Sequence, residues 1–168
     1  HQRGETDVAW DELKKQIIEL DKDPYASNEV KAEYYYRMAL WFLEDRSDVV
    51  KAQKKYERAI ELKPDYDGCV FQALKQYMTG ECPNAEDLLE PVNSASKFNV
   101  YLQICINSHK INKAYSKYEE VDQTIEMDAN TYYLLSIMEI MRREYDIAMD
   151  YIEKAIEMEN KIPFYHMI

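Results

Sequence analysis

The stretch Val50–Tyr66, VKAQKKYERAIELKPDY, decides the fold of this chain. Ala52, Tyr56 and Ala59 are spaced i, i+4 and i+7, which places them on one face of an α-helix, and Pro64 ends that helix. Small residues at two of these positions allow a neighbouring helix to approach closely, while the tyrosine fills the gap between them. The stretch therefore predicts a helix that packs against a second helix.

The partner helix comes just before it, in AEYYYRMALWFLED (residues 32–45). Four of its residues are spaced i, i+3, i+4 and i+7, again with one small residue among large ones: Tyr35, Met38, Ala39 and Phe42. The segments 28–45 and 48–62 are predicted to form an antiparallel helical hairpin. Because the same spacing recurs downstream, the chain is predicted to be an array of helical repeats.

The predicted array has a partial unit at 7–20 and four hairpins, at 28–62, 67–92, 96–126 and 130–159. Equivalent alanines mark the second helix of each hairpin: Ala52, Ala85, Ala114 and Ala148. The interval from Ala85 to Ala114 is the shortest of the three, and Pro91 lacks the amide hydrogen that a continuing helix needs. The second hairpin is therefore expected to contain a short second helix.

Composition supports a helical protein and argues against two kinds of partner. The 168 residues include only three Gly but 15 Tyr and eight Met, a helix-rich composition with adaptable packing. Lys and Arg number 21 against 32 Asp and Glu, a net charge of −11. Such an acidic chain is poorly suited to nucleic acid, which is bound largely through its phosphates, and to anionic membranes. No run reaches the about 18 apolar residues of a membrane-spanning helix.

The hairpin at 28–62 resembles the tetratricopeptide repeat family, whose unit has about 34 residues. The matching residues are Tyr35, Met38, Ala39, Phe42, Ala52, Tyr56, Ala59 and Pro64, with one extra residue in the turn. The third and fourth hairpins match but lack the closing proline, and Glu139 stands where the fourth should have its second aromatic residue. The second hairpin keeps Ala85 but is shortened. The resemblance covers about residues 7–161.

The resemblance implies an all-α, right-handed superhelix of about nine helices, whose first helices line a concave groove for a peptide or a partner helix. The groove positions that it implies are Tyr36, Leu40, Phe71, Lys75, Asn99, Gln103, Tyr133 and Ile137. The alternative is that neighbouring helices bury several of them. Chaperone-binding members of the family hold a terminal carboxylate with Lys, Asn and Arg, which are largely missing here. An apolar or uncharged polar ligand is therefore expected.

The two ends suggest a longer polypeptide. Residues 1–6 are polar and are expected to be a disordered segment or a tag remnant, and residues 162–168 look like the start of a further, truncated helix. Further repeats or another domain of the same polypeptide are therefore expected. The three cysteines, Cys69, Cys82 and Cys105, have no paired spacing and are interpreted as reduced thiols of a cytoplasmic protein.

Residues that could carry chemistry are few. Cys69, Cys82 and His109 lack the spacing of a zinc site, and the segment from Asp21 to Ala32 lacks the glycine and glutamate of a calcium loop. Two basic stripes are present, one of Lys51, Lys54, Lys55 and Arg58, the other of Lys110, Lys113 and Lys117. Each is interpreted as a solvated face beside acidic residues, with contact to RNA as the alternative.

These observations favour a non-catalytic scaffold that binds a protein or peptide and needs no cofactor or metal. One alternative is a sensor in which a bound peptide controls a fused DNA-binding or effector domain. The other is an RNA-binding repeat protein that uses the two basic stripes, against which the net charge argues.

Overall fold

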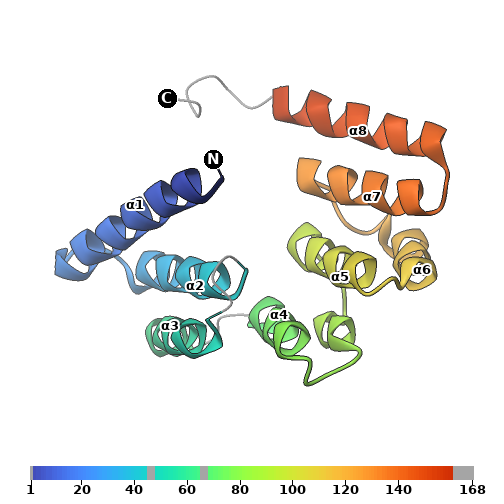
Figure 1. Cartoon of the computed structure of the whole chain (residues 1–168). Coiled ribbons are helices and arrows are strands. Elements are labelled where there is room, and N and C mark those ends of the chain that lie inside the picture. Colours follow the sequence, from blue (N-terminus) through green and yellow to red (C-terminus); the bar gives the residue numbers. More distant parts are fainter. Residues whose placement is uncertain (1, 45–47, 65–67, 161–168) are drawn as a thin grey trace. The chain divides into compact units, whose positions relative to one another are not determined.

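The computed structural model describes residues 2–44, 48–64 and 68–160, and this part of the chain is all-α (Figure 1). It contains α1 (Gln2–Lys22), α2 (Asn28–Glu44), α3 (Val49–Leu62), α4 (Cys69–Thr79), the 3-10 helix η1 (Ala85–Leu89), α5 (Ala95–Asn107), α6 (Ile111–Val121), α7 (Ala129–Met141) and α8 (Tyr145–Asn160). The all-α prediction is confirmed. The chain divides into two compact units, residues 1–71 and 72–168, and α4 spans the division.

In the first unit, α2 and α3 pack together and run antiparallel. The Lys51 ammonium lies 5.8 Å from the centre of the Phe42 ring, and that of Lys55 lies 5.7 Å from the Tyr35 ring, so later residues of α3 meet earlier residues of α2. Ala39, Ala52 and Ala59 are fully buried, as their spacing predicts. The Asp48 side chain caps α3 by accepting a hydrogen bond of 3.1 Å from the Lys51 amide.

Ala59→Leu is expected to lower the free energy of unfolding by about 1–3 kcal/mol, because the fully buried Ala59 leaves no room for a larger side chain. Urea unfolding measures the change. Glu57→Leu is the matched control, since it adds the same side chain to the same helix at an exposed position. Equal stability of the two variants would show that the assigned face of α3 is wrong.

The passage from α3 to α4 is closely packed around Tyr56. Its ring stacks on Phe71 with the ring centres 4.2 Å apart and the planes 8° from parallel. A Cβ atom on Gly68 would lie 1.9 Å from the Tyr56 hydroxyl oxygen, so only glycine leaves room for the ring in this position. Phe71 is fully buried as a result.

In the second unit, α5 packs against η1, α6 and α7, and α7 packs against α8. Thr131 Oγ1 on α7 donates a hydrogen bond of 2.6 Å to Asn99 Oδ1 on α5, and these residues are 32 positions apart. Tyr151 Oη on α8 donates one of 2.8 Å to Tyr118 Oη on α6, 33 positions away. Contacts at this separation are those of neighbouring repeats, so the second unit is consistent with a helical repeat.

Two segments differ from the prediction, and a third lies outside the described residues. Helix α1 begins at Gln2 rather than at residue 7. The second helix of the hairpin at 67–92 is short and ends before Pro91, as expected, but it is the five-residue 3-10 helix η1 rather than an α-helix. The described residues therefore hold eight α-helices rather than about nine, and the further helix predicted at 162–168 falls outside them.

Glu139, which stands where the resemblance expects an aromatic residue, is almost fully buried. The Arg142 guanidinium donates to both of its carboxylate oxygens, at 3.0 and 2.9 Å. The same guanidinium lies 3.6 Å from the centre of the Tyr115 ring on α6. A charge-assisted, ring-stacked arginine thus joins α7 to α6 at the position of the missing aromatic side chain.

Candidate functional site

Three of the eight predicted groove residues are buried and cannot offer an accessible surface. Tyr36 lies beside Tyr56, with the ring centres 6.5 Å apart, and Phe71 stacks on the same ring. Asn99 donates to Asp128 at 3.1 Å and accepts from Thr131. Each of these side chains joins neighbouring helices, which agrees with the alternative that several groove positions are buried. Their role in binding stays a prediction, against which this burial argues.

The other five predicted groove residues are at least partly accessible. Leu40, Lys75 and Ile137 are half-buried, and Gln103 and Tyr133 are exposed. Leu40 belongs to the first unit and the other four to the second. Their role in binding stays a prediction.

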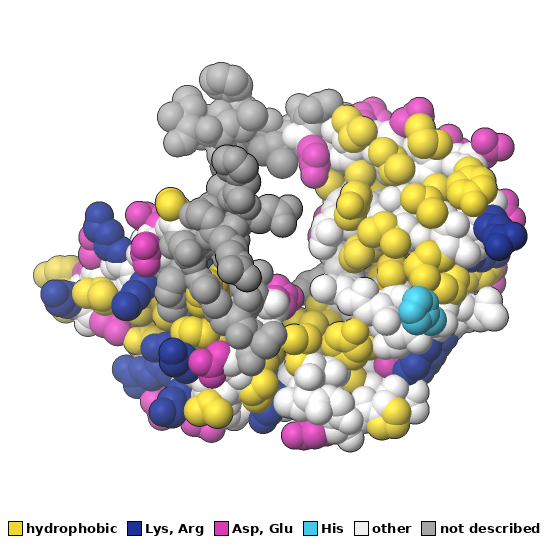
Figure 2. Space-filling model, in the orientation of Figure 1, with side chains coloured by type: hydrophobic (Ala, Val, Ile, Leu, Met, Phe, Trp, Pro, Cys, Tyr) yellow, Lys and Arg dark blue, Asp and Glu magenta, His cyan; other side chains and the backbone are white. Residues whose placement is uncertain are grey.

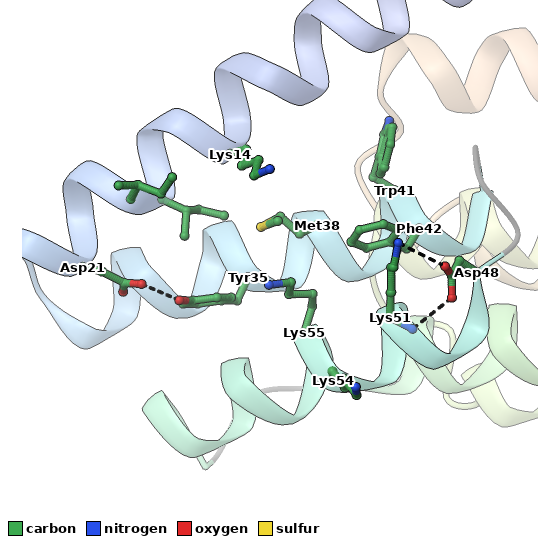
Figure 3. Close-up of a pocket in the computed structure, with 12 residues that line it drawn as sticks. Lys14, Asp21, Tyr35, Met38, Trp41, Phe42, Asp48, Lys51, Lys54 and Lys55 are labelled. Atoms are coloured by element: carbon green, nitrogen blue, oxygen red, sulfur yellow. Dashed lines mark hydrogen bonds and ion pairs between the residues drawn. The ribbon is translucent and has the colours of Figure 1, made fainter.

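A cleft of about 870 Å³ lies between α1, α2 and α3 in the first unit (Figure 3). Helix α1 supplies residues spaced i, i+3, i+4 and i+7, which share one helix face. The lining residues are Lys14, Ile17, Ile18, Asp21, Tyr35, Met38, Trp41, Phe42, Asp48, Lys51, Lys54 and Lys55.

The inner wall of the cleft is apolar. Met38 and Phe42 of α2 are buried, as is Ile17 of α1, and the Trp41 ring meets the Phe42 ring edge-on with the centres 5.2 Å apart. Tyr35 Oη donates a hydrogen bond of 2.6 Å to Asp21 Oδ2, which joins α2 to α1 at one end of the cleft. Burial, together with this carboxylate, raises the pKa of Tyr35, so its hydroxyl remains the donor at neutral pH.

The rim carries four ammonium groups against two carboxylates. Lys14 comes from α1, and Lys51, Lys54 and Lys55 come from the first two turns of α3. Both carboxylates make contacts within the cleft: Asp21 with Tyr35, and Asp48 with the Lys51 ammonium at 3.7 Å. The cleft is therefore locally positive in a chain whose net charge is −11.

Each lysine of the second basic stripe is paired with a carboxylate. Glu86, fully buried on η1, accepts hydrogen bonds from Lys110 at 2.7 Å and Lys113 at 2.8 Å. Lys117 pairs with Glu120 at 3.0 Å and also with Glu90. The stripe therefore lies beside acidic residues, as interpreted, but it is not a solvated face, because Lys117 is buried and Lys110 and Lys113 are half-buried.

The described residues offer little else for chemistry. No group of three or more His, Cys, Asp and Glu side chains within 2–44, 48–64 and 68–160 is arranged to hold a metal ion. All three cysteines are thiols, and burial raises the pKa of Cys105 to about 12, which keeps it protonated and unreactive. None of the described helices has the length and apolarity needed to cross a bilayer.

Comparison with known proteins gives no significant match to a family model, to a curated protein or to a solved structure.

Sequence reasoning found the lysines of α3 but not the cleft that they border. The missing part is α1, which is predicted only as a partial unit at 7–20, with no face assigned to Lys14 or Ile18. The spacing of Lys14, Ile17, Ile18 and Asp21 mixes charged and apolar residues on one helix face. Such a mixture of charged and apolar residues indicates a helix face that neighbouring helices cover only in part.

Proposed function

We propose that this chain is a non-catalytic protein-binding module whose cleft between α1, α2 and α3 takes a peptide segment that combines acidic and apolar side chains. The observation that carries the proposal is the lysine rim around an apolar, aromatic wall, in a chain that is otherwise strongly acidic. We propose further that the helices belong to a tetratricopeptide-like, right-handed superhelical array. The antiparallel α2–α3 pair and the contacts at repeat separation in the second unit support this architecture.

Each part of the cleft matches one part of such a ligand. Apolar side chains of the ligand would cover Met38, Trp41 and Phe42, and burial of apolar area contributes about 25 cal/mol per Å². Carboxylates of the ligand would meet Lys54 and Lys55 at the rim. Partly exposed charge pairs add little energy individually, but they select an acidic partner and speed its association.

Protein is favoured over RNA because the described lysines of the second stripe are engaged by carboxylates of η1 and α6. An RNA strand needs an extended positive path along its phosphates. The cleft supplies one short positive region instead, beside an apolar wall that suits a peptide.

The test uses a fluorescein-labelled peptide in which Glu alternates with Leu and Phe, and a second peptide with Lys in place of Glu. Lys54→Glu with Lys55→Glu is expected to weaken binding of the acidic peptide at least about tenfold, or about 1.4 kcal/mol, because two attractive charges become repulsive. Fluorescence anisotropy at two salt concentrations measures the affinity. The Lys peptide is expected to bind poorly to the unmodified chain.

The matched control is Lys15→Glu with Lys22→Glu, which changes the net charge equally from exposed positions on α1 outside the cleft. This pair should bind almost as the unmodified chain does. Equal weakening by both pairs would assign the effect to the overall charge and contradict the cleft. Failure of the acidic peptide to bind, or tighter binding of a single-stranded RNA probe, would contradict the proposed ligand.

A further inference from the structure

Helix α8 has an apolar stripe that the second unit leaves exposed. Its buried side consists of Ala148, Tyr151 and Ala155, which face the rest of the unit. Beside that side, four apolar residues are spaced i, i+4, i+7 and i+11: Tyr145, Met149, Ile152 and Ile156. Tyr145, Met149 and Ile156 are 60%, 53% and 52% exposed, which is high for large apolar side chains.

Helix α7 extends this surface. Tyr133 and Ile140 are exposed, and Ile137 between them is half-buried. They lie on the side of α7 opposite Thr131, the residue that contacts α5. In the same way, the exposed stripe of α8 lies away from Tyr151, the residue that contacts α6. Figure 2 shows hydrophobic side chains gathered over α7 and α8. The two helices thus share one apolar face, called here the α7–α8 face.

Comparison with the preceding hairpin, α5 and α6, indicates what the α7–α8 face can bind. Aligning Ala114 with Ala148 makes Tyr133 the equivalent of Asn99, and Met149 the equivalent of Tyr115. Asn99 contacts Thr131 of the following hairpin, and the Tyr115 ring contacts the Arg142 guanidinium of the same following hairpin. The equivalent positions on α7 and α8 are therefore placed to receive a helix.

A row of carboxylates runs beside the apolar stripe. Asp146, Asp150, Glu153 and Glu157 repeat the spacing of the stripe one residue further along and are all exposed. We propose that the α7–α8 face binds an amphipathic helix of a partner protein that carries Lys or Arg beside its apolar residues. Its apolar side chains would cover Tyr133, Met149 and Ile156, and its cations would meet the carboxylate row.

Charge selects this occupant over two others. A second copy of the chain would bring an identical carboxylate row to the interface, where like charges oppose association. Nucleic acids and anionic bilayers are repelled by the same row. Residues 161–168, KIPFYHMI, contain one lysine and no acidic residue, and their binding here is a separate outcome of the test.

The test measures binding of a labelled helical peptide with Leu at i, i+3, i+4 and i+7 and Lys beside it, against a version with Glu in place of Lys. The full chain is expected to prefer the Lys version. Met149→Ser with Ile156→Ser should weaken its binding at least about tenfold, because central apolar anchors dominate such interfaces. Asp150→Lys with Glu153→Lys should reverse the preference between the two peptides.

Ile147→Ser is the control, since Ile147 is also exposed, at 42%, but lies on the other side of α8. Equal weakening by Ile147→Ser, or no preference for Lys over Glu, would overturn the proposal. A dimer in light scattering that Ile156→Ser dissolves would assign the face to a second copy. Peptide binding that appears only after residues 161–168 are removed would assign it to that segment. Because this probe is basic and the cleft ligand acidic, failure here leaves the proposed function standing.

Discussion

Phe71→Ala is expected to lower the free energy of unfolding by about 3–5 kcal/mol, the range for truncating a buried phenylalanine to alanine. Phe71 is fully buried and stacks on Tyr56 at 4.2 Å. The neighbouring chain cannot easily close the cavity, because Gly68 already lies against the Tyr56 ring. Urea unfolding measures the loss, and hydrogen exchange should place the increased opening in α3 and the start of α4.

Tyr133→Ala is the informative control for this prediction. Both residues are predicted groove aromatics on first helices, but Tyr133 is 56% exposed. Its truncation should change the free energy of unfolding by no more than about 0.5 kcal/mol. A Phe71→Ala variant as stable as Tyr133→Ala would mean that Phe71 is accessible, and would restore its predicted place in a groove.

The contrast between these residues shows what sequence spacing can predict. Ala39, Ala52 and Ala59 were placed correctly because the contact of two helices within a hairpin depends on periodicity alone. Whether Phe71 or Tyr133 is covered depends on the side chains of a neighbouring helix, which the periodicity of one helix does not reveal. A family resemblance gives the groove positions of a typical member. In this chain the Tyr56 ring stacks on Phe71 and buries it, which argues against the predicted place of Phe71 in a groove.

The cleft was missed for a related reason. Its lysines were visible on α3, but α1 forms the opposite wall, and the spacing of either helix says nothing about the gap between them. Likewise, the short second helix expected in the hairpin at 67–92 is the 3-10 helix η1, whose buried Glu86 contacts Lys110 and Lys113, more than 20 residues further along the chain. Such long-range pairs are not encoded in local periodicity.

Glu86 is a fully buried carboxylate that two lysines contact. Its Oε1 accepts from the ammonium groups of Lys110 at 2.7 Å and Lys113 at 2.8 Å, while the side chain is fully buried. Lys110 also donates to the Pro83 carbonyl oxygen at 2.6 Å, which fixes the segment before η1. Burial alone would raise the pKa of Glu86, but the hydrogen bonds from the two lysines outweigh it and lower the pKa.

Glu86→Gln is therefore expected to lower the free energy of unfolding by about 3 kcal/mol at neutral pH, the lower end of the range for breaking a buried ion pair, because both lysines reach solvent. The folded-state pKa lies below the unfolded value, so this stabilisation is complete above the unfolded pKa of about 4.3 and is lost as the pH falls through the folded pKa. The variant should accordingly lose less stability on acidification than the unmodified chain.

Asp87→Asn is the control, since Asp87 is half-exposed and its pair with Lys113 contributes at most about 1 kcal/mol. Equal destabilisation by both substitutions, or an unchanged acid dependence in Glu86→Gln, would show that the buried carboxylate does not hold η1 in place.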